Sequence, residues 1–233
     1  MFMAGQLNPF SGVIEGLRTL IFPETCIMCE SANAMICESC NLYWIAPARR
    51  VHFDLVPTFS VVEYNQEVSS VILKAKEERN QSAQKLIANA IHRGVDALRT
   101  ETGMSRFVLV PIPSSRIALR KRGESFLHPI MNRTIEFEKR KSRTSKTNWQ
   151  WVDLLKYRKE VRDQAGLSSY ERNENLKGAF SASYDPQCPV ILVDDVITTG
   201  ATLKNAVGAC RERNMTVLGA VTACASPYQL LIR

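Results

Sequence analysis

The most restrictive feature of the sequence is an apolar run that ends in two acidic residues and continues into a loop of threonine and glycine. Residues 190–202 read Val-Ile-Leu-Val-Asp-Asp-Val-Ile-Thr-Thr-Gly-Ala-Thr. A short continuous apolar run is typical of a strand that is buried on both faces, as in a parallel sheet. Such a strand delivers Asp194 and Asp195 to the carboxyl edge of the sheet, where open α/β folds bind their ligands.

The rest of the chain alternates between apolar, Val-rich segments and segments with helical spacing of apolar residues. The predicted strands are 58–64, 107–110, 189–195 and 215–222. The predicted helices lie within 68–73, 86–98, 126–137 and 201–213. Buried strands that alternate with helices predict an α/β fold with a mainly parallel sheet flanked by helices.

The loop after the acidic pair has the composition of an anion cradle. Thr198, Thr199 and Thr202 offer hydroxyl groups, and Gly200 permits close approach of the backbone. A helix is predicted to start at Ala201, so its free N–H groups and positive dipole end face the loop. This arrangement suits a phosphomonoester.

The two acids suit a different part of the same ligand. Carboxylates accept hydrogen bonds from hydroxyl groups, such as the vicinal pair of a ribose. The segment therefore predicts a site for a ribose 5-phosphate. Two alternatives remain open: adjacent acids after a strand can hold Mg²⁺, and a Thr-Gly loop can be only a helix cap. A P-loop is excluded because no G-x-x-x-x-G-K-[ST] motif is present.

A second motif lies near the N-terminus. Four of the seven cysteines form two CxxC pairs, Cys26 with Cys29 and Cys37 with Cys40. Two such pairs can present four thiolates to one tetrahedral Zn²⁺ ion, which predicts a structural zinc site. A redox CxxC and a disulfide module are the alternatives; redox pairs usually occur singly, and nothing in the sequence suggests export.

Composition limits the class of protein and of partner. Lys and Arg number 30 against 23 for Asp and Glu, and the resulting net charge of +7 favours anionic partners such as phosphates or nucleic acid. No apolar run approaches the roughly 20 residues that span a bilayer, and we expect no secretory signal in residues 1–22. We therefore expect a cytoplasmic protein without a membrane span.

One basic stretch has two interpretations. Residues 139–146 are rich in Lys and Arg, and Trp149 and Trp151 follow. Phosphate contacts and base stacking would make this stretch a site for single-stranded nucleic acid. The favoured interpretation is a solvated loop that precedes inward-packed tryptophans, because charge runs usually face solvent.

With these motifs in place, the chain resembles a known family. Residues 190–202 look like the phosphoribosyl pyrophosphate (PRPP) motif of type I phosphoribosyltransferases, and the wider chain is similar to the ComF family (ComFC/GntX-like proteins). The further matching segments are 20–23 before the cysteines, 109–113 with Arg116 and 120–123, and a central block of Leu154–Arg158, Gln164, Leu167, Ser168, Glu171, Arg172, Asn175 and Gly178–Phe180. The chain departs from the family at Glu124 and Ser125, where Phe-Asn is usual.

The resemblance implies roles for these residues. Asp194 and Asp195 would hold the ribose hydroxyls, and Thr198, Thr199, Gly200, Ala201 and Thr202 would wrap the 5′-phosphate. Ile112 and the following Pro113, Ser114 and Ser115 would form the pyrophosphate loop. The candidate catalytic residues Arg120, Lys121 and Arg122, together with Arg116, would lie on a mobile loop over the leaving group, where Mg²⁺ and guanidinium groups stabilise negative charge.

The helical spacing of Ile14, Leu17, Leu20 and Ile21 predicts an amphipathic helix within residues 1–21, and the CxxC pairs predict a zinc-ribbon-like module at 22–46. The resemblance implies that residues 52–233 form the type I phosphoribosyltransferase-like domain, and it also implies a biological setting. The family is linked to natural transformation, imported single-stranded DNA and a competence helicase or translocase. Two main hypotheses follow: a PRPP-binding phosphoribosyltransferase-like protein whose acceptor and catalytic activity are open, or a non-catalytic nucleic-acid-binding adaptor with PRPP as a regulatory ligand. A third is a PRPP-dependent purine-salvage enzyme, but we expect no turnover with free bases.

Overall fold

A mostly parallel five-stranded sheet organises the protein, in the order β1-β2-β7-β6-β3. The computed structural model describes residues 25–32, 34–141, 149–158 and 178–230. The parallel strands are β2 (Thr58–Glu63), β7 (Val217–Ala225), β6 (Val190–Ile197) and β3 (Val108–Pro111), and β1 (Arg49–Arg50) adds an antiparallel edge. This topology confirms the predicted α/β fold class.

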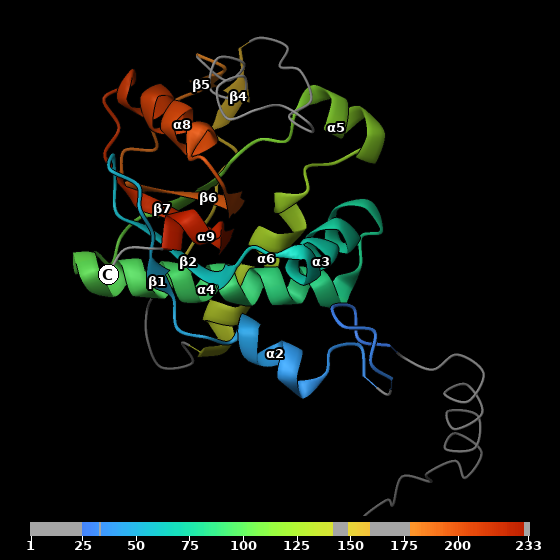
Figure 1. The fold of residues 1–233 in the computed structure, drawn as a ribbon. Coiled ribbons are helices and arrows are strands. Elements are labelled where there is room, and N and C mark those ends of the chain that lie inside the picture. Colours follow the sequence, from blue (N-terminus) through green and yellow to red (C-terminus); the bar gives the residue numbers. More distant parts are fainter. Residues whose placement is uncertain (1–24, 33, 142–148, 159–177, 231–233) are drawn as a thin grey trace, which may run out of the picture.

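Helices cover both faces of the sheet. Figure 1 shows α8 (Ala201–Arg211) on one side and α3 (Gln66–Glu77), α4 (Gln81–Thr102) and α6 (Leu127–Lys141) on the other. A small antiparallel sheet of β4 (Leu155–Tyr157) and β5 (Phe180–Ala182) lies next to α8. The short helices are α2 (Glu38–Trp44), α5 (Arg116–Arg122) and α9 (Pro227–Leu230).

Helix α4 shows how local sequence and packing agree. The side chain of Asn80 caps its first turn by accepting a hydrogen bond from the Ala83 N–H, and Gly103 ends it in the left-handed conformation. Gly94 lies where the helix meets β7, and a Cβ atom there would come within 2.4 Å of Val221. The small residue allows the helix to approach the sheet closely and bury its apolar face.

The cysteine segment shares the core of the larger domain. Cys26 and Trp44 are fully buried in the same apolar cluster as the strands. Ser70 and Lys74 of α3 donate hydrogen bonds to the Ile27 carbonyl at 3.2 and 3.4 Å. The domain boundaries at residues 22–46 and 52–233 stay a prediction.

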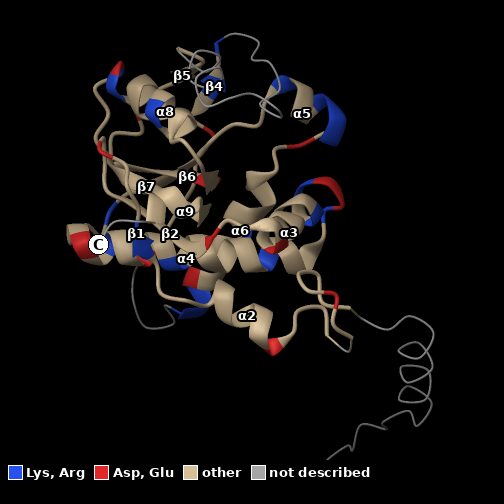
Figure 2. Ribbon diagram, viewed as in Figure 1, with Lys and Arg blue, Asp and Glu red and all other residues tan. Residues whose placement is uncertain are grey.

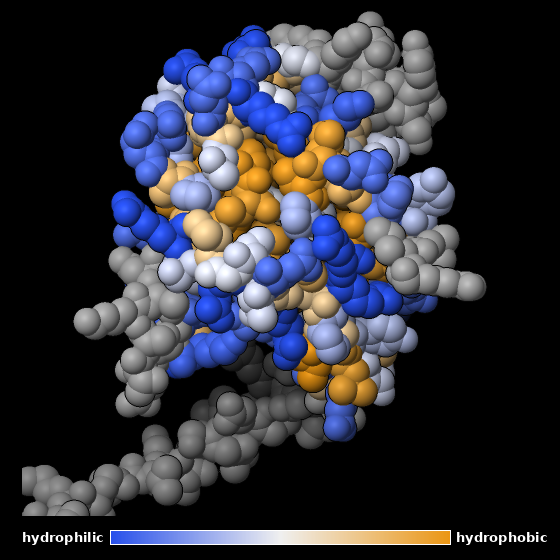
Figure 3. Space-filling model, turned by 90° about the vertical axis from the view of Figure 1, so that its left-hand side faces the viewer, coloured by the Kyte–Doolittle hydropathy of each residue, from blue (hydrophilic) through white to orange (hydrophobic). Residues whose placement is uncertain are grey.

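The described residues contain no helix that is long and apolar enough to cross a membrane. The predicted helix at 1–21 lies outside them, as do residues 142–146 of the basic stretch. Trp149 is only 3% exposed and packs against His92 and Phe107, as the inward-packed interpretation expects. Figure 3 shows a face on which polar residues surround a central apolar area, so that face is mixed rather than uniformly charged.

Candidate functional site

A cavity of about 280 Å³ lies at the carboxyl edge of the sheet, and we call it the edge cavity. It forms where β6, the loop after β3, α5 and α3 meet. Eight of the residues singled out from the sequence line it: Ile112, Pro113, Ser114, Ser115, Arg122, Asp194, Thr198 and Thr202. Residues almost 90 positions apart in the chain therefore meet at one site.

The loop between β6 and α8 has the geometry of an anion cradle. Gly200 is in the left-handed conformation with φ of 76°, and a Cβ there would lie 3.0 Å from the Phe53 ring. Gly200 is also the N-cap of α8 and offers no side-chain cap. Among the residues that the structure describes, the only side-chain partner of the first N–H groups of α8 is Thr199 Oγ1, which lies 3.4 Å from the Ala201 N–H.

The two acids of β6 have different surroundings. Asp194 is partly exposed and lines the edge cavity, where its Oδ1 accepts a hydrogen bond from the Asp195 N–H at 2.9 Å. Asp195 is only 8% exposed, and its Oδ2 lies 2.6 Å from Nζ of Lys76. Burial, followed by repulsion from Asp195, raises the pKa of Asp194 well above its ordinary value.

Lys76 is the main site residue that the sequence did not indicate. It lies near the end of α3, lines the edge cavity and has its ammonium group 5.1 Å from the centre of the Phe126 ring. Burial acts to lower its pKa, but the charges of Asp195 and Asp194 leave the pKa raised overall. A lysine within a helical stretch carries no local signal of this contact, because the partner acids are more than 110 residues away.

The loop after β3 contributes hydroxyl groups from the opposite side of the edge cavity. Ser115 caps α5 by accepting a hydrogen bond from the Ala118 N–H at 3.2 Å. Ser114 Oγ accepts a hydrogen bond from the Phe126 N–H at 3.3 Å and lies 3.4 Å from the Ser125 hydroxyl. The loop is therefore fixed against the start of α6.

Helix α5 is mostly basic and is followed by an acidic turn, as Figure 2 shows. Arg122 lines the edge cavity, and its side chain is 15% exposed. Glu77 of α3 holds both Arg122, at 3.2 Å, and Lys121, at 2.6 Å. The hydrogen bond from Lys121 is the main cause of a lowered pKa at Glu77.

Seven of the predicted site residues do not line the edge cavity. Asp195 is buried, and Arg116, Arg120 and Lys121 lie on α5 outside the cavity lining. Thr199, Gly200 and Ala201 instead line a hollow of about 390 Å³ on the other side of the loop, next to Phe53. Their roles in ligand binding stay predictions, since backbone N–H groups can act without a lining side chain.

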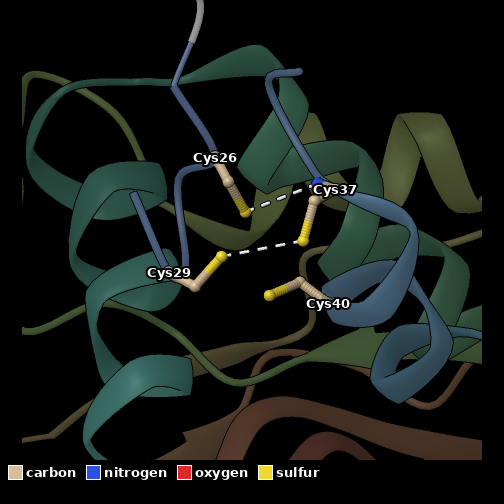
Figure 4. A group of neighbouring side chains, drawn as sticks. All are labelled: Cys26, Cys29, Cys37 and Cys40. Carbon is tan, nitrogen blue, oxygen red and sulfur yellow. Dashed lines mark hydrogen bonds between the residues drawn. The ribbon is translucent and has the colours of Figure 1, made fainter. Parts of the chain in front are cut away.

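The four cysteines of the N-terminal module meet in one cluster. One sulfur from each lies within 4.8 Å of the others, and Figure 4 shows the four side chains converging. The Sγ atoms of Cys29 and Cys37 are 3.6 Å apart, and the Cys37 N–H donates to Cys26 Sγ at 3.4 Å. An all-sulfur set of this size fits a tetrahedral Zn²⁺ ion.

The two CxxC pairs are presented differently. The first pair lies in a turn, whereas Cys37 is the N-cap of α2 and Cys40 lies in its first turn. Burial acts to raise the pKa of Cys26. Backbone hydrogen bonds from Cys29, Cys37 and Met28 outweigh this effect and lower the pKa to about 6. Burial and the neighbouring thiols raise the pKa of Cys40. A bound cation would favour the thiolate form of all four.

The parallel sheet, the edge cavity and the cysteines define an α/β protein with a cavity at the carboxyl edge of its sheet and a four-cysteine cluster that could hold a metal ion. The chain is similar to Competence protein F of Haemophilus influenzae (strain ATCC 51907 / DSM 11121 / KW20 / Rd), with 30% identity over 151 residues. The match covers 60% of this chain and 60% of that relative, and it confirms the resemblance noted from the motifs. No family model matches the chain.

Among solved structures, the chain matches a hypoxanthine phosphoribosyltransferase from Staphylococcus aureus. It has a TM-score of 0.35 and 15% sequence identity, and the match covers 64% of this chain and 67% of that chain.

Proposed function

We propose that this protein binds PRPP, or another ribose 5-phosphate, in the edge cavity, and that it acts in natural transformation as a phosphoribosyltransferase-like protein. The observation that carries the proposal is the convergence of Asp194, the loop with Thr198 and Thr202, and Arg122 on one cavity. Each of these groups suits a different part of the same ligand. The similarity to Competence protein F supports the link to transformation.

The ligand parts map onto the edge cavity as follows. The 5′-phosphate would accept hydrogen bonds from the first N–H groups of α8, assisted by the hydroxyls of Thr198 and Thr202. Ribose hydroxyls would donate to Asp194, which lines the cavity more directly than Asp195 does. The pyrophosphate would lie between the loop at 113–115 and Arg122, whose guanidinium can engage two phosphate oxygens.

Transfer of the ribose to an acceptor places growing negative charge on the pyrophosphate. Arg122 would stabilise this charge from within the edge cavity, and Mg²⁺ bound with PRPP would supply further positive charge. Lys76 would hold the acid pair of β6 near neutrality, since Asp195 is its direct partner.

Calorimetric titration with PRPP and Mg²⁺ tests the binding claim. The wild type should bind, and the Asp194→Asn/Asp195→Asn variant should lose at least about tenfold in affinity, because two hydroxyl acceptors are weakened. Asp185→Asn, a change of an exposed acid outside the cavity, is the matched control. Equal affinities in the wild type and the double variant would rule out the ribose assignment.

The second candidate is a non-catalytic nucleic-acid-binding adaptor, with a competence helicase or translocase as its partner. The net charge of +7 and the basic end of α6 at 139–141 favour it. Trp149 cannot supply base stacking because it is buried, which leaves phosphate contacts and the partly exposed Trp151. Binding of single-stranded DNA should then fall steeply with salt, and absence of binding at low salt would eliminate this candidate.

A further inference from the structure

A lysine of the chain lies where the sequence left room for a metal ion. Adjacent acids after an apolar run can hold Mg²⁺, and Asp194 and Asp195 form such a pair on β6. In the structure, Nζ of Lys76 lies 2.6 Å from Oδ2 of Asp195. Among the described residues, no other cationic side chain forms an ion pair with either acid. The acid pair therefore has a cationic partner before any metal or ligand binds.

Helix α3 holds this lysine in place. The side chain of Asn65 caps the helix by accepting a hydrogen bond from the Val68 N–H at 2.8 Å, and Ile72, one turn before Lys76, is buried in the core. The ammonium group also lies 5.1 Å from the centre of the Phe126 ring, whose face attracts a cation. The positive charge is thus tethered, because the packing of α3 fixes where it can reach.

The acid pair does not suit a resident Mg²⁺ ion. Such an ion needs six oxygen ligands in near-octahedral geometry and usually keeps several waters. Oδ2 of Asp195 already faces the ammonium group, and Asp195 is only 8% exposed. Oδ1 of Asp194 accepts a hydrogen bond from the Asp195 N–H at 2.9 Å. A divalent ion on these oxygens would also lie close to the charge of Lys76 and be repelled by it.

The second cationic side chain that lines the edge cavity is engaged with another partner. Arg122 lies 3.2 Å from Glu77, the residue that follows Lys76 on α3. Burial acts to lower the pKa of Lys76, but the charges of Asp195 and Asp194 leave it raised. Lys76 is therefore the protonated group with which a metal ion would have to compete.

We propose that Lys76 is the resident cation of the acid pair and that it excludes free divalent metal ions from the edge cavity. A hydrated ion on Asp194 would cover the carboxylate oxygens that face the cavity, whereas the tethered ammonium group pairs with Asp195 and leaves them open. Lys76 is a positioning residue, because it acts through Asp195. The consequence for PRPP, that Mg²⁺ enters the cavity only together with phosphate oxygens, rests on the proposed function.

Titration with Mn²⁺, followed by the electron paramagnetic resonance signal of the free ion, tests the exclusion without PRPP. The full chain is used with its cysteine cluster loaded with zinc and the excess zinc removed, so that the thiols do not take up Mn²⁺. The wild type should bind Mn²⁺ no more tightly than the millimolar range. Lys76→Met should gain one site per chain with an affinity at least about tenfold higher, because the repulsion is gone and Asp195 is released.

Three further variants show whether a gained site is the acid pair. Lys76→Arg keeps the positive charge and should exclude Mn²⁺ as the wild type does. Lys85→Met removes the same charge from an exposed position of α4 outside the edge cavity, and it should also behave as the wild type. The double variant Lys76→Met/Asp195→Asn should lose the gained site. A purely structural role of Lys76 would not produce a gain of metal affinity that Arg reverses.

Lys76→Gln keeps the test decisive if Lys76→Met does not fold, because the amide is a neutral donor and the same gain is expected. Equal affinities for Mn²⁺ in the wild type and in the folded neutral variants would overturn the role of Lys76. So would a tight Mn²⁺ site in the wild type that Asp194→Asn removes. Calorimetry with PRPP separates the two proposals: a wild type that binds PRPP but also free Mn²⁺ at the acid pair overturns this inference alone. A wild type that excludes Mn²⁺ but does not bind PRPP overturns the proposed function, and the exclusion by Lys76 is upheld.

Discussion

The cysteine cluster and the edge cavity are both preformed, but their charges are balanced differently. In the edge cavity, α3 supplies a partner to each side: Lys76 to Asp195, and Glu77 to Lys121 and Arg122. In the cysteine cluster, the four sulfurs lie within 4.8 Å and contact one another. The charged side chains around the edge cavity are thus largely paired with opposite charges. The four thiols of the cluster, in contrast, all become negative when they ionise.

Because of this difference, we expect the cysteine cluster to contribute mainly to stability and the edge cavity mainly to ligand binding. Thiolates so close together repel each other unless a cation joins them, so metal binding should contribute to folding. The internal ion pairs of the edge cavity allow the fold to form without a ligand. We therefore expect changes in the cluster to affect mainly the free energy of unfolding, and changes in the cavity to affect mainly binding.

Loss of the metal ion should have the largest effect on the free energy of unfolding. Cys26→Ser, or treatment with a chelator, should remove zinc and lower the free energy of unfolding by on the order of 4 kcal/mol, because Cys26 is also fully buried in the core. Zinc binds the thiolate forms, so retention of zinc should weaken as the pH falls and protons compete for the four sulfurs. Elemental analysis and thermal unfolding measure both quantities.

The matched control for the cluster is Cys188→Ser. Cys188 is partly exposed and lies outside the four-cysteine group, so its change should alter the free energy of unfolding by only about 0.5 kcal/mol. Purified wild type with far less than one zinc per chain would contradict the structural role of the cluster.

The next effect distinguishes the two neighbouring acids of β6, Asp194 and Asp195. The folded-state pKa of Asp194 is raised, so its contribution to stability is present below the unfolded pKa near ~4 and is lost as the pH rises through the folded pKa. Asp194→Asn should therefore stabilise the protein at pH 7, by roughly 1 kcal/mol, and have little effect near pH 3. Urea unfolding at the two pH values measures the difference.

The same substitution at the next residue should act in the opposite direction. Asp195→Asn removes the partner of Lys76 and leaves that ammonium group without its carboxylate, which should cost about 1–3 kcal/mol at pH 7. Destabilisation by both variants to the same extent would show that the two acids do not differ in the way described.

The smallest expected effect concerns the basic helix α5. Glu77→Gln should free Lys121 and Arg122 and raise the affinity for inorganic pyrophosphate with Mg²⁺ by only about two- to threefold, because partly exposed ion pairs are weak. Glu78→Gln, which removes the same charge at the exposed next position, is the control. A gain of affinity in both variants would indicate a general effect of net charge rather than release of a specific pair.

Much of the fold and part of the site could be predicted from local patterns. The apolar run before Asp194 predicted strand β6, and Gly200 predicted the turn before α8. Both conformations depend mainly on neighbouring residues, so a local pattern is enough to predict them. The position of Lys76 could not be predicted in this way. It lies in a helix whose sequence shows only an amphipathic pattern, and its partner comes from a distant segment.

Two parts of this molecule follow from short stretches of chain: four sulfurs spaced over 15 residues, and a strand that runs through an acid pair into the N-terminus of a helix. Such features need only the backbone rules of turns, strands and helix ends. The tertiary structure decided which acid faces the edge cavity and which lysine neutralises the other. Packing of the helices against the sheet brings those groups together, and that packing depends on the whole chain at once.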